Sequence, residues 1–113
     1  MLKATLKTML AHTCRLTGVL GAHERRQDGQ LSILCFHRVL PEAQRQAYFS
    51  PVLAITPEAF ETICATLAAQ EVRVLPLNEA VEAYLNPGDL GRVVALTFDD
   101  GYRDNAIYAA PIL

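Results

Sequence analysis

One stretch decides the fold of this chain: Arg92-Val93-Val94-Ala95-Leu96-Thr97-Phe98-Asp99-Asp100-Gly101-Tyr102. Its apolar part is continuous and follows the turn signal Asn86-Pro87-Gly88-Asp89, which is typical of a buried strand in a parallel sheet. Ligands of such sheets bind beyond the carboxyl ends of the strands. The two aspartates therefore stand where we expect a functional site.

Asp99 and Asp100 are candidates for a metal or acid-base site. Consecutive side chains point to opposite faces of a strand, so two carboxylates converge only where the backbone leaves the extended form. Gly101 permits this departure because glycine takes a positive φ at no steric cost. Two close carboxylates repel each other, and a divalent cation or a shared proton relieves the repulsion. The alternative is that one aspartate is the N-cap of a following helix and the other is solvated.

Strands and helices alternate ahead of this stretch. A buried strand is expected at 31–37, a short strand at 72–75 and a long loop at 41–54. Thr56 and Pro57 predict the start of one helix, and Asn78 is expected to cap a second, with Ala80, Val81 and Leu85 facing inward. The order strand, helix, strand, helix, strand predicts βαβ units, a parallel sheet and the α/β class. A further helix is expected after Tyr102, with Pro111 near its boundary.

Residues 1–28 are expected to form an amphipathic helix and a linker ahead of a domain at 29–113. The apolar stripe consists of Leu2, Leu6, Met9, Leu10, Leu16 and Leu20. Lys7, His12 and Arg15 interrupt the apolar run, so neither a signal peptide nor a membrane span is predicted. Residues 1–20 either pack on their own domain or contact a membrane surface, which favours a cytoplasmic or membrane-peripheral location.

Composition limits the classes of function. The 113 residues suffice for one small domain or for part of a larger one, and they are 51% hydrophobic and 19% charged. A net charge of −2 argues against nucleic acid as a partner. Cys14, Cys35 and Cys64 show no disulfide or zinc spacing, and the last two are expected to be small buried hydrophobes.

Two motifs resemble those of the polysaccharide deacetylases, the NodB-homology family (carbohydrate esterase family 4-like). Thr97-Phe98-Asp99-Asp100-Gly101-Tyr102-Arg103-Asp104-Asn105, with Ala110-Pro111-Ile112-Leu113 after it, is similar to the first catalytic motif of the family. Ile33-Leu34-Cys35-Phe36-His37-Arg38-Val39 is similar to the first-strand signature of one branch. The resemblance covers the chain from about Leu31 to its C-terminus. It implies the N-terminal part of a distorted (β/α) barrel.

The same resemblance implies a metal-dependent hydrolase that removes N-acetyl groups from an amino-sugar polymer. It assigns Asp99 as the general base and Asp100 as a ligand of a divalent metal, often zinc. In the family, two histidines of a later His-x-x-x-His motif complete the metal site. His37 closes the first predicted strand, where it either contacts the substrate beside Asp99 or is a structural histidine.

No His-x-x-x-His motif occurs in the sequence, whose histidines are His12, His23 and His37. We therefore expect a truncated form that is inactive by itself. A second hypothesis is a non-catalytic remnant that self-associates through uncovered apolar faces. A third is a phosphoryl-transfer protein that uses the same acidic pair.

Overall fold

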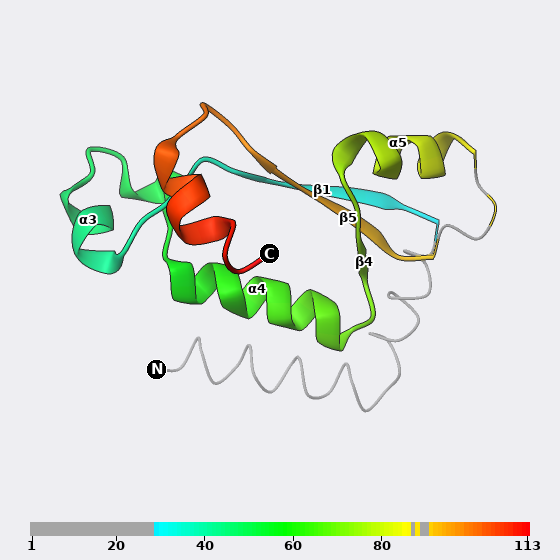
Figure 1. Ribbon diagram of the computed structural model, residues 1–113, viewed down its shortest axis with the longest axis horizontal. Coiled ribbons are helices and arrows are strands. Elements are labelled where there is room, and N and C mark those ends of the chain that lie inside the picture. The colour runs from blue at the N-terminus through cyan, green and yellow to red at the C-terminus, as the bar shows by residue number, and fades with distance from the viewer. Residues whose placement is uncertain (1–28, 87, 89–90) are drawn as a thin grey trace, which may run out of the picture.

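The computed structural model describes residues 29–86, 88 and 91–113, and the predicted helix and linker at 1–28 lie outside this part (Figure 1). Strands and helices alternate as the sequence predicts, and the chain is of the α/β class with parallel strands. The elements are β1 (Leu31–Phe36), β2 (Arg38–Val39), α3 (Glu42–Ala47), η1 (Pro51–Leu53), β3 (Ala54–Ile55), α4 (Pro57–Ala69), β4 (Arg73–Val74), α5 (Leu77–Leu85), β5 (Val93–Phe98) and η2 (Asn105–Ala109).

β5 is the central strand of the larger sheet, which has the order β1-β5-β4 with all strands parallel. Val93, Val94 and Ala95 are buried, as expected for an apolar run flanked by strands on both sides. The register pairs Leu31 with Val93 and Phe36 with Phe98. β2 and β3 form a separate parallel pair. The predicted buried strand and parallel pairing are confirmed.

The two faces of the β1-β5-β4 sheet are covered by different helices. Phe60 of α4 is fully buried, and its ring meets the rings of Phe36 and Phe98 at 5.2 and 5.6 Å. On the other face, Ala80 of α5 packs with Val93 and Ala95. In Figure 1, α4 runs along the sheet, whereas α5 lies beside the beginning of β5 only.

This placement of α5 leaves the far half of its sheet face uncovered. Side chains alternate along a strand, so Cys35 lies on the face of Ile33, and Thr97 on the face of Val93 and Ala95. Ile33 is 52% exposed and Cys35 is exposed as well. We call the surface formed by Ile33, Cys35, Thr97 and Asp99 the open face. The expectations that Cys35 is a buried small hydrophobe and that 31–37 is a buried strand are therefore wrong, because none of the described helices packs over this end of the sheet.

The helix boundaries follow local sequence signals to different degrees. Thr56 is the N-cap of α4, and its hydroxyl accepts a hydrogen bond from Ala59 N at 3.2 Å, as predicted. α5 instead begins at Leu77 behind Pro76, so Asn78 is not its cap. Of the three α5 residues expected to face inward, only Ala80 is buried, whereas Val81 and Leu85 are exposed.

Two further segments differ from expectation. The stretch 41–54 is not a plain loop, because it contains α3 and η1. The last helix is a short π-type turn, η2, that ends before Pro111, consistent with proline at a helix boundary. Within the described residues, no helix is long and apolar enough to cross a membrane.

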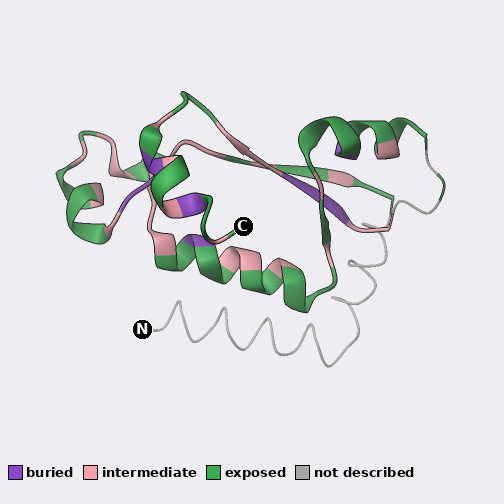
Figure 2. Cartoon of the chain, viewed as in Figure 1, coloured by how far each residue is buried: buried purple, intermediate pink, exposed green. Residues whose placement is uncertain are grey.

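Large apolar side chains remain at the surface. Phe49 and Val52 are 87% and 86% exposed, and both lie in the segment between β2 and β3. Figure 2 shows that the buried residues are confined to β5, the α5 contact and the region where β2, α4 and η2 meet. In the described part of the chain, the core therefore consists of two small clusters on opposite faces of the sheet.

Candidate functional site

His37 and Asp99 lie side by side just beyond the ends of two neighbouring strands. β1 and β5 are parallel and in register at their last residues, and Asp99 N donates to Phe36 O at 2.8 Å, which continues the pairing. This places His37 Nε2 3.9 Å from Asp99 Oδ2. The side chains are 34% and 53% exposed, respectively, so both are open to a ligand.

Cys35 belongs to the same group, and sequence reasoning missed it. Its sulfur, a ring nitrogen of His37 and a carboxylate oxygen of Asp99 all lie within 4.8 Å of one another. Hydrogen bonding to Asp99, followed by desolvation, raises the pKa of the Cys35 thiol, so the thiol is protonated at neutral pH. The signal in the sequence was the spacing Cys35-x-His37, because residues two apart on a strand share a face.

Asp100 and Gly101 form a sharp turn directly after Asp99. Their φ values are +68° and +63°, in the left-handed region that aspartate tolerates better than most residues and glycine adopts freely. A Cβ at Gly101 would meet nothing within 4 Å, so the backbone angle and not lack of space calls for glycine. The predicted departure from the extended form is confirmed.

The two aspartates occupy different surroundings. Asp99 extends the open face, whereas the carboxylate of Asp100 is outside the described group of close ligand atoms. Neither residue directly precedes η2, whose N-cap is Asp104. Both carboxylates are exposed. The hydrogen bond with Tyr48 is the main cause of the raised pKa of Tyr102, and the charge of Asp100 adds to it, as it does to the raised pKa of Cys35.

Residues after the turn hold the backbone around His37 in place. Asp104, only 7% exposed, accepts hydrogen bonds from Arg38 Nε and from Val39 N, both at 3.2 Å. Asn105 Nδ2 donates to His37 O at 3.1 Å. Asp104 and Asn105 thus brace the segment that follows β1.

Arg38 is enclosed by two tyrosines as well as by Asp104. Its guanidinium carbon lies 4.7 Å from the ring centre of Tyr48 and 4.3 Å from that of Tyr102. Desolvation would lower the pKa of Arg38, but the hydrogen bond and the charge of Asp104 outweigh it and raise that pKa. Arg38 therefore acts as a fixed cation that joins β2, the start of η2 and the Tyr48 segment.

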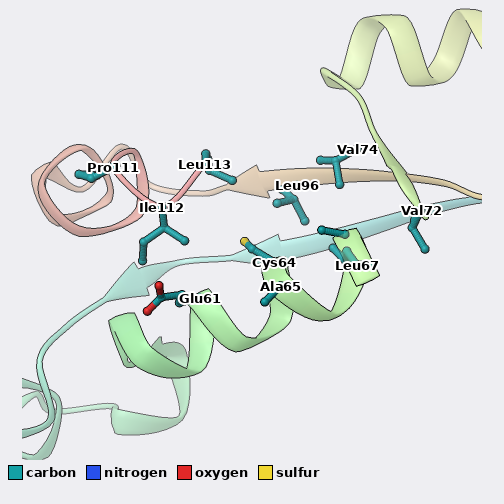
Figure 3. A pocket seen from close by; sticks show the side chains of 11 residues that line it. Glu61, Cys64, Ala65, Leu67, Val72, Val74, Leu96, Pro111, Ile112 and Leu113 are labelled. Carbon is teal, nitrogen blue, oxygen red and sulfur yellow. The ribbon is translucent and has the colours of Figure 1, made fainter. Parts of the chain in front are cut away.

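A cavity next to this site and a second cavity away from it differ in size and in the residues that line them. A hollow of about 140 Å³ is lined by Cys35 to Arg38 and by Val52 to Ile55. A larger one of about 570 Å³ lies between α4, Leu96 and the C-terminal residues (Figure 3). Its polar side chains are limited to Glu61 and Cys64, and burial raises the pKa of the Cys64 thiol. We therefore place the candidate site at the smaller hollow and the open face.

Comparisons with known proteins found no family model, no curated protein and no solved structure that matches the chain. Its function is therefore inferred from the motifs in the sequence and from the geometry of Cys35, His37 and Asp99.

Proposed function

We propose that this chain carries the catalytic base of a metal-dependent polysaccharide deacetylase and forms the first part of a NodB-type (β/α) barrel. The position of Asp99 supports this proposal most directly. Its half-exposed carboxylate stands at the tip of the central strand, 3.9 Å from His37 Nε2, and a left-handed turn follows it. Catalytic side chains of α/β folds are found at such strand ends.

In the proposed reaction, Asp99 accepts a proton from a water molecule that attacks the acetyl carbonyl. The new carbon–oxygen bond gives a tetrahedral intermediate, whose collapse breaks the carbon–nitrogen bond. The protonated Asp99 then returns its proton to the departing amine. Acetate and a free amino sugar are the products.

A polymeric substrate suits the openness of the site. The hollow of about 140 Å³ beside His37 is smaller than a typical pocket for a whole ligand, of roughly 300–1,000 Å³, so it suits a group the size of an acetyl. The sugar units would then lie on the surface outside it. Tyr48 and the exposed Phe49, whose ring centres are 4.6 Å apart, offer aromatic surface next to Arg38. His37 is proposed to contact the substrate from the same side.

The metal site of the family is not reproduced by the described residues. The resemblance assigns one ligand to Asp100 and two to histidines, but His37 is the sole histidine among residues 29–113. Its neighbours in the close group are Cys35 and Asp99, and Asp100 is not among them. We still propose a divalent metal, zinc by resemblance, as the cofactor of the protein.

The test is a deacetylation assay on the full-length product of the reading frame that encodes these residues. With zinc present, we expect the protein to release acetate from an N-acetylglucosamine oligomer and to leave simple phosphate esters intact. Hydrolysis of the phosphate esters without acetate release would instead favour phosphoryl-transfer chemistry at the acidic pair. Activity on neither substrate would contradict an enzymatic role.

A non-catalytic, self-associating module is the second candidate. It is favoured by exposed apolar side chains, among them Phe49, Val52 and Leu85, and by sheet strands β1 and β4 that each pair on one side within the described part of the chain. In the same assay this candidate predicts no product. Light scattering would then show stable oligomers.

A further inference from the structure

Three different metal-binding groups, a thiol, an imidazole and a carboxylate, lie close together at the open face. Cys35 and His37 lie two residues apart on β1 and its extension, and Asp99 extends β5 directly beside them. Their ligand atoms, Sγ, a ring nitrogen and a carboxylate oxygen, are all within 4.8 Å of one another. β1 and β5 are paired continuously from Leu31–Val93 to Phe36–Phe98. This pairing fixes the backbone positions from which the three side chains extend.

The distances are close to those that a tetrahedral zinc site needs. Zinc binds sulfur at about 2.3 Å and nitrogen or oxygen at about 2.0–2.2 Å, so two tetrahedral ligands are roughly 3.6 Å apart. The observed group must therefore contract by about 1 Å. Rotation of the side chains allows this contraction, because Cys35 and Asp99 are exposed among the residues that the structure describes.

The donor set also suits zinc or cobalt better than a hard cation. Thiolate and imidazole are ligands of zinc, whereas magnesium and calcium prefer oxygen alone. Three protein ligands leave the fourth position of a tetrahedral ion for water or substrate. The exposed carboxylate of Asp100 adds negative charge nearby without being one of the three.

We propose that Cys35, His37 and Asp99 form a zinc site with a thiolate, imidazole and carboxylate donor set. This site differs from the ligand assignment that the deacetylase resemblance implies, and it stands whether or not the chain is a deacetylase. Asp99 cannot bind this zinc and act as the free base of the proposed reaction at the same time, so the site is tested by metal binding and not by deacetylation.

Cobalt titration of the full 113-residue chain under reducing conditions tests the site, with zinc competition as the measure of affinity. We expect one cobalt per chain and a near-ultraviolet absorption from thiolate-to-cobalt charge transfer, which zinc abolishes. A matched control, the Cys14→Ser/Cys64→Ser double variant, retains Cys35 as its single thiol. It should keep the full absorption, whereas Cys35→Ser should lose it.

The remaining ligands are tested in the same way. His37→Ala and Asp99→Asn should each weaken cobalt binding by at least about 10-fold, because even the loss of a residue that only hydrogen-bonds to a ligand can have this effect. Glu79→Gln, which neutralises an exposed acid in the first turn of α5, should bind cobalt as the unchanged chain does. The inference is overturned if the double variant shows no charge-transfer absorption. It is also overturned if Asp100→Asn abolishes binding and Cys35→Ser does not, a result that would leave the proposed deacetylase intact.

Discussion

Asp99→Asn is expected to lower the kcat of deacetylation in the full-length protein by roughly 10²–10⁴-fold, the usual contribution of a general base. Asparagine has nearly the same shape as aspartate but cannot accept the proton of the attacking water. The fold should tolerate the change, because the Asp99 side chain is 53% exposed and its backbone N–H keeps the bond to Phe36 O. Acetate release from an N-acetylglucosamine oligomer is the measurement.

Glu79→Gln is the matched control for this experiment. Glu79 is an exposed acid in the first turn of α5, near the beginning of β5 and away from the site (Figure 1). Its neutralisation removes the same charge and should leave kcat unchanged. If Asp99→Asn and Glu79→Gln retain equal activity, Asp99 is not the base and the assignment of the site fails.

Asp104→Ala is expected to destabilise the fold by about 2–4 kcal/mol. The substitution leaves Arg38, which is enclosed by Tyr48 and Tyr102, without its carboxylate partner and removes the acceptor of the Val39 N–H. The loss would be a large share of the stability of a small domain, typically about 5–15 kcal/mol. Urea unfolding of the chain, followed by circular dichroism, gives the change in free energy.

Glu42→Ala provides the comparison for an exposed ion pair. Glu42 binds Arg45 at 2.8 Å through an i,i+3 contact on α3, with side chains 50% and 31% exposed. Exposed pairs of this kind are screened by water and contribute little, so the free energy of unfolding should hardly change. Equal losses for Asp104→Ala and Glu42→Ala would mean that the Arg38–Asp104 pair is as weak as an exposed pair and does not brace the site.

The sheet was predicted well because its central strand is buried, and a buried strand has a clear apolar run in the sequence. An apolar run between turn signals identified β5, and the alternation of strands and helices implied parallel pairing. Thr56 marked the start of α4 for a purely local reason, since an N-cap depends on neighbouring backbone groups. The NodB-type barrel remains a prediction beyond the parallel α/β arrangement that the structure has.

Burial was predicted wrongly where it depends on tertiary contacts, which local sequence patterns do not show. Cys35 follows the apolar residues of β1 and was expected to be buried, yet it is exposed because α5 covers the other end of the face. Leu85 fits an inward helical stripe, but α5 meets the sheet mainly through Ala80 and Ala83. Short elements such as α3 also lacked a signal, since one and a half turns give too few residues for a period.

The candidate site was predicted in part. Asp99 and His37 were named from their places at strand ends, and the register of β1 and β5 brings them together. The participation of Cys35 depended on which half of the sheet lacks a helix, which the sequence did not indicate. The roles of Asp99, Asp100 and His37 as base, metal ligand and substrate contact remain predictions.

The central claim is that the ends of β1 and β5 form one functional site, and an NMR titration tests it most directly. The isotope-labelled chain of 113 residues is titrated with an N-acetylglucosamine oligomer, and backbone amide shifts are followed. We predict that the shifts centre on His37, Asp99 and Gly101. Shifts centred instead on the cavity of Cys64, Leu67 and Ile112, or no shifts at all, would contradict the account.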